Sequence, residues 1–198
     1  MKKYTKDTIK FYDKNIKAYT TSHSAVVLKS QINKFIKEVK GDKILDIACG
    51  PGHDTDYLTE KGFDSLGIDL SKKMITYAKK NFKGKFKIMD FFDLKFKANT
   101  FNGIWCSSGL THVEKKDIDR ILKEFSKILK KEGTLGIIAP KTKKRIPDEK
   151  NDKRIFTMFH KKEIEKYLIK NKFKIISSEI FTYAYNRIKW ILIIAKLT

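Results

Sequence analysis

The sequence has few cysteines, and their number and spacing exclude several kinds of protein. Cys49 and Cys106 are the only two in 198 residues, and each lies in or beside an apolar run. A small secreted scaffold held by disulfides is therefore excluded, and both cysteines are predicted to be core residues in a reducing compartment. Neither has a CxxC partner, so no metal site is predicted.

Long apolar runs are missing as well. The longest, Trp190–Ala195, is far shorter than the roughly 20 residues that span a bilayer. The first residues contain no apolar stretch long enough for a signal peptide. We therefore expect a cytoplasmic protein that makes no use of a membrane. Hydrophobic residues make up 41% and are spread along the chain, which predicts a single folded domain over residues 1–198.

Positive charge is in excess, with a formal net charge of +21, but arginine is scarce. The four arginines are Arg120, Arg145, Arg154 and Arg187, and all the other basic residues are lysines. Nucleic-acid recognition favours arginine and gathers cations on one face, whereas these lysines are scattered over every segment. We interpret the charge mainly as compositional bias and keep RNA as an alternative partner.

The spacing of apolar residues predicts two helices followed by alternating strands and helices. Helices over residues 4–20 and 24–40 belong to an N-terminal part, residues 1–41, that is expected to cover a ligand site. Strands are predicted at 43–48, 64–69, 85–89, 101–107 and 133–139, and helices at 53–61, 71–81 and 115–131. This alternation predicts right-handed crossovers and a parallel sheet covered on both faces.

The C-terminal part has a different pattern. A helix over 161–171 is followed by strands at 173–181 and 187–197. Only residues 183–186 separate these strands, so they are predicted to form an antiparallel hairpin at an edge of the sheet. The connection over 140–157 is polar, rich in lysine and long, and it is a candidate lid.

The most informative segment is DIACGPG, which lies between the first predicted strand and its helix. In a doubly wound sheet, ligands bind at the carboxyl ends of the strands. Gly50 and Gly52 allow the backbone to approach a ligand closely. Asp69 ends the second strand, where its carboxylate can accept hydrogen bonds from a ribose diol. Asp90 ends the third strand, where it can accept from an adenine amino group, with Phe91 against the ring.

The same segment argues against a dinucleotide. The dinucleotide fingerprint is GxGxxG, and Thr55 stands at its third glycine position. A pyrophosphate binds helix-end amides and avoids nearby anions, so the carboxylate of Asp46 would oppose it. Asp46 instead suits an adenosyl ligand that carries an ammonium and a sulfonium. A nicotinamide oxidoreductase is therefore disfavoured.

Five segments in order resemble the class I S-adenosylmethionine-dependent methyltransferases. They are ILDIACGPGHDTDYL, GIDLS, KIMDFFDL, FNGIWCSSGLTHV and LKEFSKILKKEGTLGIIAPK, and they cover Lys43–Lys141. The C-terminal segment also resembles small bacterial members. The resemblance implies an α/β, Rossmann-like, doubly wound sheet of seven strands in the order 3-2-1-4-5-7-6, with the last strand antiparallel. One departure is Ala48, where the family often has glycine.

The resemblance also implies that S-adenosylmethionine is the cofactor, and it assigns residue roles. Asp46 and the backbone at Ala48, Cys49, Gly50 and Gly52 hold the methionine part, Asp69 the ribose, Leu70, Met74, Asp90 and Phe91 the adenine, and Ser107 the floor beside the methyl group. Tyr12 and Tyr19 close over the cofactor. The other interpretations are that the glycines serve only the turn, that Asp69 and Asp90 are caps, and that the tyrosines only pack the N-terminal helix.

Methyl transfer needs alignment and exclusion of water, and it needs a base only if the acceptor must lose a proton. His112 follows the fourth strand closely and is the candidate base. The other interpretation is that His112 only packs or begins the next helix.

The acceptor is expected to be a small molecule. No Asn/Asp-Pro-Pro-Tyr run follows the fourth strand, which disfavours methylation of exocyclic amines, and Cys106 lacks the preceding proline of cytosine-C5 enzymes. A cover of N-terminal helices suits a small acceptor. An RNA methyltransferase and a non-catalytic adenosyl-binding subunit are the alternatives.

Overall fold

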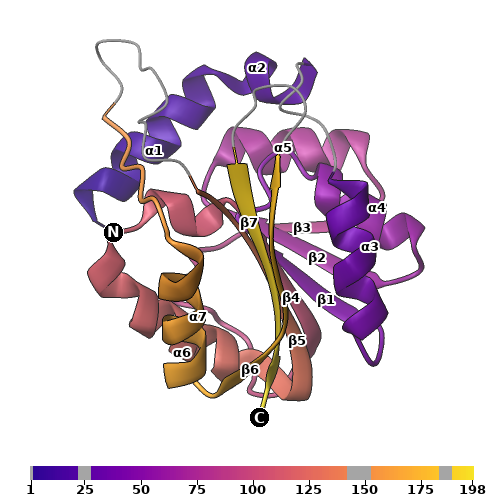
Figure 1. The fold of residues 1–198 in the computed structure, drawn as a ribbon. Helices are drawn as coiled ribbons and strands as arrows, with labels where there is room; N and C mark the ends of the chain where they lie inside the picture. The colour runs from indigo at the N-terminus through magenta and orange to yellow at the C-terminus, as the bar shows by residue number, and fades with distance from the viewer. Residues whose placement is uncertain (1, 22–27, 142–152, 183–188) are drawn as a thin grey trace.

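The computed structural model describes residues 2–21, 28–141, 153–182 and 189–198, which form a layered α/β structure (Figure 1). The strands are β1 Lys43–Ile47, β2 Asp64–Asp69, β3 Lys85–Ile88, β4 Phe101–Ser107, β5 Leu129–Pro140, β6 Phe173–Thr182 and β7 Lys189–Leu197. They form one sheet of order β3-β2-β1-β4-β5-β7-β6, parallel from β3 to β5, with β7 antiparallel to both of its neighbours. The fold class, the strand order and the antiparallel hairpin are confirmed.

Helices cover both faces of this sheet. They are α1 Lys3–Lys14, α2 Ile16–Thr21, α3 Lys29–Glu38, α4 His53–Glu60, α5 Lys72–Asn81, α6 Ile118–Ile128 and α7 Lys161–Lys170, with short 3-10 turns η2 Gly109–His112 and η3 Lys115–Asp117. Side chains of α3, α4 and α5 pack on one face, and those of α6 and α7 on the other. No helix among the described residues is long and apolar enough to cross a membrane.

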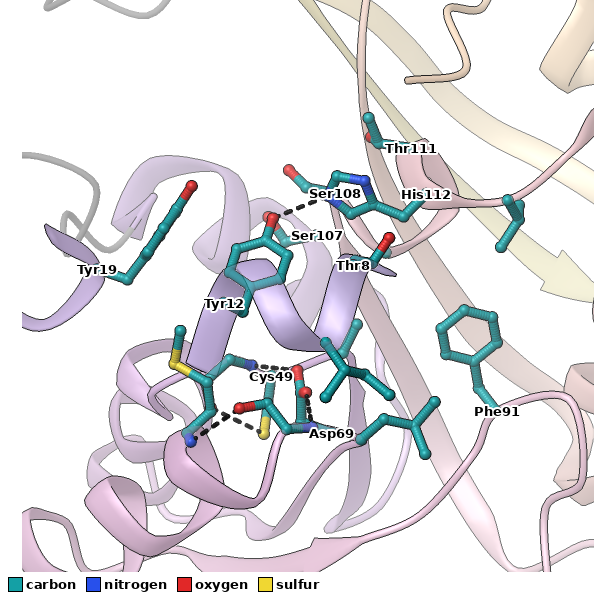
Figure 2. A pocket seen from close by; sticks show the side chains of 18 of the residues that line it. Thr8, Tyr12, Tyr19, Cys49, Asp69, Phe91, Ser107, Ser108, Thr111 and His112 are labelled. Atoms are coloured by element: carbon teal, nitrogen blue, oxygen red, sulfur yellow. Dashed lines mark hydrogen bonds between the residues drawn. The ribbon is translucent and has the colours of Figure 1, made fainter. Parts of the chain in front are cut away.

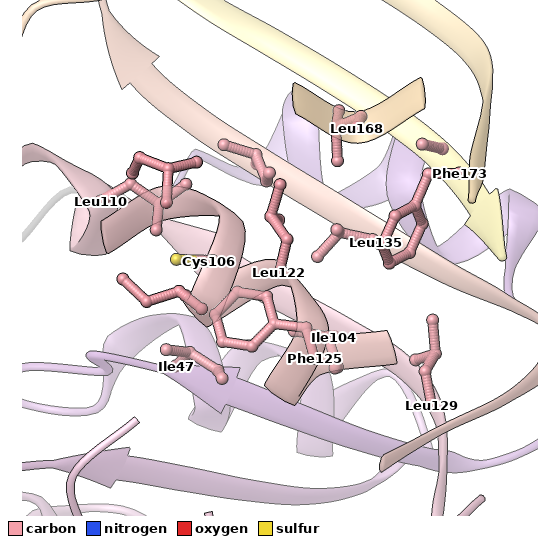
Figure 3. Close-up of a cluster of buried hydrophobic side chains, with 14 of the residues drawn as sticks. Ile47, Ile104, Cys106, Leu110, Leu122, Phe125, Leu129, Leu135, Leu168 and Phe173 are labelled. Atoms are coloured by element: carbon pink, nitrogen blue, oxygen red, sulfur yellow. The ribbon is translucent and has the colours of Figure 1, made fainter. Parts of the chain in front are cut away.

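Two apolar clusters pack against opposite faces of the central strands. On one face, Leu122 and Phe125 of α6 pack on strand residues such as Ile104 and Leu135 (Figure 3). On the other face, Phe35 of α3 contacts Trp105, with ring centroids 5.2 Å apart. Gly136 makes room for this pair, since a Cβ there would lie 2.6 Å from the indole ring of Trp105. Both faces of the central strands are therefore buried, as expected for a parallel sheet.

The N-terminal part is divided between two locations. The predicted helix over 4–20 is interrupted at Asn15, whose side-chain Nδ2 and backbone N both lie within hydrogen-bond distance of the Phe11 carbonyl, at 2.9 and 3.0 Å. An asparagine side chain competes in this way with helical hydrogen bonds, and it ends α1. No described side chain of α1 is fully buried. Whereas α3 packs on the sheet through Ile32 and Phe35, α1 contacts α5 and η2 at the carboxyl ends of the strands.

The predicted helix over 115–131 is wrong at both ends. A 3-10 turn precedes α6, and the chain leaves the helix at Leu129, which is completely buried and pairs with Phe101 of β4. Apolar spacing cannot distinguish the last turn of a helix from the first buried residue of the next strand. The pairing then shifts register before Thr134, and the positive φ of Glu132, +60°, marks the irregularity.

Some predictions fall outside the described residues. The start of the predicted helix over 24–40, the link over 183–186 and the first residues of the strand over 187–197 lie there. Most of the candidate lid over 140–157 lies there as well. Its final residues, 153–157, are described and reach the cavity discussed below.

Candidate functional site

A cavity of about 580 Å³ opens at the carboxyl ends of the parallel strands, beneath α1 (Figure 2). Its lining includes every predicted site residue except Gly52, namely Tyr12, Tyr19, Asp46, Ala48, Cys49, Gly50, Asp69, Leu70, Met74, Asp90, Phe91, Ser107 and His112. These residues come from elements between α1 and η2. The fold therefore gathers into one space the positions that the sequence motifs single out.

The turn after β1 uses left-handed backbone conformations. Ala48, Gly50 and Gly52 have φ values of 56°, 53° and 94°. Ala48 adopts a conformation that costs an alanine about 1 kcal/mol, which explains why glycine is common there. A Cβ on Gly50 would meet nothing within 4 Å, whereas one on Gly52 would lie 2.7 Å from the ring of Phe86. Gly50 thus leaves room for a ligand, and Gly52 allows the turn to pack on β3.

Asp69 joins the end of β2 to this turn. Its Oδ2 accepts from the backbone N–H of Gly50 at 3.0 Å, and its Oδ1 accepts from that of Ser71 at 2.8 Å. Burial raises the pKa of Asp69, and these backbone hydrogen bonds oppose the rise. Each carboxylate oxygen has a second lone pair, so both can still accept from a hydroxyl in the cavity. A capping role and a ribose-binding role are therefore compatible.

Two further carboxylates lie behind the turn. Asp46 is buried and accepts from Thr55 Oγ1 at 2.6 Å. Thr55, which replaces the third glycine of the dinucleotide fingerprint, is therefore the hydrogen-bond donor to Asp46. Asp54, in the first turn of α4, accepts from the indole N–H of Trp105 at 2.9 Å. Burial, and then the nearby Asp54, raise the pKa of Asp46 well above its ordinary value, and burial raises the pKa of Asp54 to about 6. This part of the cavity would be stabilised by a cationic ligand.

We expect Asp54→Asn to stabilise the ligand-free protein at neutral pH. Because the folded-state pKa of Asp54 is raised to about 6, its contribution to stability is fully present below pH 3.8 and is lost as the pH rises through 6. Asparagine avoids this loss and can still accept from Trp105. Urea unfolding should show the variant more stable by about 1–3 kcal/mol at pH 7.5, with the difference vanishing near pH 4.

Asp56→Asn is the matched control, because Asp56 lies on the same helix outside the cavity lining. It removes a carboxylate from the first turn of α4 without changing the buried group. If both variants changed stability with the same dependence on pH, burial of Asp54 would not be the cause. A parent protein more stable than Asp54→Asn at pH 7.5 would also contradict the prediction.

The adenine side predicted from the sequence is formed by β3 and the residues after it. Asp90 Oδ1 accepts from the backbone N–H of Phe92 at 2.9 Å, which fixes the carboxylate at the strand end. The rings of Phe91 and Phe92 are stacked, with centroids 5.3 Å apart. Met74 of α5 is buried and lines the same cavity. Apolar side chains and a fixed hydrogen-bond acceptor therefore line the part of the cavity where adenine is predicted to bind.

His112 is held with a nitrogen directed at Tyr12, as Figure 2 shows. Its Nδ1 lies 2.9 Å from the carbonyl oxygen of Ile155, which can only accept, so we infer that Nδ1 carries the proton. Nε2 then accepts from the Tyr12 hydroxyl at 2.8 Å. Burial raises the pKa of Tyr12, which keeps it protonated as the donor. With Nδ1 protonated, Nε2 is the nitrogen that could take part in a short proton relay through Tyr12.

The central part of the chain is similar to known methyltransferases. Residues 44–133 match the family model described as a methyltransferase domain. The demethylmenaquinone methyltransferase of Thermotoga maritima is 32% identical over 122 residues, which are 59% of this chain and 52% of that protein. These matches agree with the resemblance to the class I S-adenosylmethionine-dependent methyltransferases that the sequence motifs indicate. It spans about half the length of the curated relatives that it matches.

Solved methyltransferase structures have the same fold. An S-adenosylmethionine-dependent methyltransferase of Methanosarcina mazei aligns with a TM-score of 0.77 at 24% identity, covering 87% of this chain and 99% of that one. The 1,6-didemethyltoxoflavin-N1-methyltransferase of Burkholderia thailandensis aligns with a TM-score of 0.78 at 17% identity, covering 98% and 87%. That structure contains 1,6-didemethyltoxoflavin and S-adenosylhomocysteine. At these identities the likeness establishes the fold alone.

Several of the residues that line the cavity were missed by sequence reasoning. Asp54 lies in the first turn of α4, directly after the glycine turn. This position next to the motif could have identified it as a residue that lines the cavity. Arg154, Phe156 and Trp190 come from the C-terminal part of the chain. Their approach depends on β7 pairing with β5, which brings Trp190 beside Pro140, and no local spacing reveals that contact.

Proposed function

We propose that this protein binds S-adenosylmethionine and transfers its methyl group to a small-molecule acceptor. The observation that supports this most strongly is the set of three carboxylates, Asp46, Asp54 and Asp69, lining one cavity of a chain with a net charge of +21. Burying carboxylates costs free energy that a neutral or anionic ligand would not recover. A ligand with an ammonium and a sulfonium would recover it.

The residues fit the parts of that ligand. Asp46 and Asp54 would balance its positive charges, Asp69 would hold the ribose, and Asp90 with Phe91 would bind the adenine edge. His53 Nε2 lines the same cavity, is buried, and has no hydrogen-bond partner among the described residues. It can donate to the carboxylate of the methionine part. S-adenosylmethionine supplies an electrophilic methyl group on sulfur when it is bound.

The protein's own contribution is alignment and proton transfer. The helix α1 lies over the cavity, and a cover that keeps water from a bound cofactor would favour direct displacement at the methyl carbon. An acceptor hydroxyl beside Tyr12 can give its proton to the tyrosine oxygen while Tyr12 gives its own to His112 Nε2. The carbonyl of Ile155 holds the imidazole in the tautomer that can accept this proton, since it lies 2.9 Å from Nδ1.

A small acceptor is favoured over RNA by the cavity lining. A cavity of about 580 Å³ is of the size that proteins use for small ligands. An RNA acceptor would favour several cations around the site, yet Arg154 is the only lysine or arginine among the described lining residues. The relatives named above act, by name, on demethylmenaquinone and 1,6-didemethyltoxoflavin, which are small molecules.

Isothermal titration tests the cofactor assignment. We expect S-adenosylmethionine and S-adenosylhomocysteine to bind with micromolar affinity and NAD not to bind, because the pyrophosphate of NAD would face Asp46 and Asp69. Heat of binding at pH 7.5 is the measurement. Tight binding of NAD, or no binding of either adenosyl ligand, would show that the assignment is wrong.

Catalysis is tested separately from binding. Protein incubated with methyl-labelled S-adenosylmethionine and fractionated metabolites should transfer label to a small-molecule fraction, and bulk RNA should remain unlabelled. Label in RNA would support the alternative acceptor. Tight cofactor binding with no transfer to any fraction would support the non-catalytic subunit.

A further inference from the structure

The charges that line the cavity are segregated by sign. The carboxylates lie at the ends of β1, β2 and β3 and at the start of α4, where the cofactor is proposed to bind. The chain has 44 lysines and arginines. Among the described residues that line the cavity, however, Arg154 is the only lysine or arginine. Arg154 therefore supplies the positive side-chain charge of the described lining, and a ligand group that meets it there is expected to be anionic.

Arg154 lies on the same side of the cavity as His112. Its guanidinium carbon is 4.7 Å from the centroid of the Phe156 ring, and that ring is 5.3 Å from the ring of His112. The guanidinium also stacks on Phe11, 3.4 Å from its centroid, and Nη1 donates to the Tyr19 hydroxyl at 3.3 Å. Stacking fixes the plane of the guanidinium while its N–H groups point outward along the edge. This geometry is suited to a planar anionic group.

Two other donors on this side indicate oxygen atoms in the ligand. The hydroxyl of Thr111, next to His112, and the indole N–H of Trp190 are buried and have no hydrogen-bond partner among the described residues. Both side chains line the cavity. A buried donor without a partner costs about 1–3 kcal/mol, which a ligand oxygen would recover. An indole N–H can only donate, so the group it meets must be an acceptor.

The walls of this side are aromatic. Tyr12, Phe156 and Trp190 line the cavity together with His112. Aromatic walls favour flat ligands, because ring faces stack on flat surfaces with little loss of conformational entropy. Figure 2 shows Thr111, Ser108 and His112 grouped on one side of Tyr12, with Cys49 and Asp69 on the other.

We propose that the acceptor is a planar aromatic or conjugated hydroxy acid whose carboxylate pairs with Arg154 while its hydroxyl faces Tyr12 and His112. This deepens the proposed function and rests on it. In the reaction an O–CH3 bond forms, the S–CH3 bond breaks and its electron pair stays on sulfur. The hydroxyl proton reaches Nε2 of His112 through Tyr12. The products are a methyl ether and S-adenosylhomocysteine.

Matched probes test the charge requirement. The protein is first saturated with S-adenosylhomocysteine, and the heat of that titration tests the proposed function separately. It is then titrated with 3,4-dihydroxybenzoate and 3,4-dihydroxybenzamide, and with 6-hydroxy-2-naphthoate and its amide. In at least one pair we expect the carboxylate to bind at least tenfold more tightly than the amide, since the two differ only in the charge that Arg154 reads.

Arg154→Met should abolish that preference, so that acid and amide bind equally, while S-adenosylhomocysteine binds as in the parent. Lys153→Met is the matched control, because Lys153 is the exposed neighbour outside the cavity lining, and it should retain the preference. Four results would overturn the proposal. These are equal binding of acid and amide by the parent, binding of no probe at millimolar concentration, retention of the preference in Arg154→Met, and its loss in Lys153→Met.

Discussion

Replacing His112 with alanine is expected to lower turnover by roughly 10²–10⁴-fold and to leave the affinity for S-adenosylmethionine nearly unchanged. The physical reason is the arrangement of the imidazole, which is held by the Ile155 carbonyl at 2.9 Å and faces Tyr12 at 2.8 Å. Removing it leaves the acceptor proton without a base. Asp69, which is proposed to hold the ribose, lies on the other side of Tyr12 (Figure 2), so cofactor binding should be retained.

The dependence of turnover on pH distinguishes a base from a packing residue. A histidine must be unprotonated to act as a base, so turnover of the parent should rise with pH, and His112→Ala should lack this rise. Tyr12→Phe keeps the ring but breaks the relay, so it should also lower turnover. His160→Ala is a control for removal of a histidine, because His160 begins α7 outside the cavity lining. Turnover within a few-fold of the parent in His112→Ala, with the same pH profile, would mean that His112 only packs.

Asp69→Ala is expected to weaken binding of S-adenosylmethionine at least tenfold while the protein stays folded. Its carboxylate holds the Gly50 turn through a 3.0 Å hydrogen bond and is proposed to accept from the ribose hydroxyls. A hydrogen bond to a charged group contributes about 1.5–3 kcal/mol, so the loss of one such bond accounts for a tenfold change. Isothermal titration measures the affinity, and circular dichroism measures folding.

Asp64→Ala is the matched control for Asp69→Ala. Asp64 is at the opposite end of β2, is exposed, and forms an ion pair with Lys85 at 2.6 Å. Exposed pairs contribute little, and this one is remote from the cavity, so affinity should be retained. An unchanged affinity in Asp69→Ala would indicate that Asp69 serves only to cap α5 and hold the turn.

Much of the fold could be predicted because its signals are local. Short buried strands, each closed by a glycine turn or an acid, gave β1, β2 and β4 close to their observed ends. The boundary between α6 and β5 could not be predicted, since Leu129 is apolar in either structure. Its position is decided by pairing with Phe101, a contact that depends on the completed sheet.

The candidate site also has a part that local sequence motifs predict and a part that they do not. The glycine turn, Asp46 and Asp69 stand at the ends of successive strands, and parallel strands bring such ends together. The contact between Tyr12 and His112 joins residues 100 apart in the chain, and that between Tyr19 and Arg154 joins residues 135 apart. No spacing rule reaches so far. The part proposed to bind the cofactor is therefore predictable from the sequence, whereas the part proposed to bind the acceptor is assembled only by the tertiary fold.

The first helix is held mainly by polar contacts at the rim of the cavity. Apolar burial does little to hold α1, which has no fully buried side chain among those described, and the helix is attached through Tyr12 to His112 and through Asp13 to Ser71. Both attachments are made to residues that line the cavity. If docking of the helix changes the affinity of the cavity for a ligand, the ligand must change the stability of the docked helix by the same free energy. Residues that add almost nothing to the core are in this sense part of the protein's affinity for its ligands.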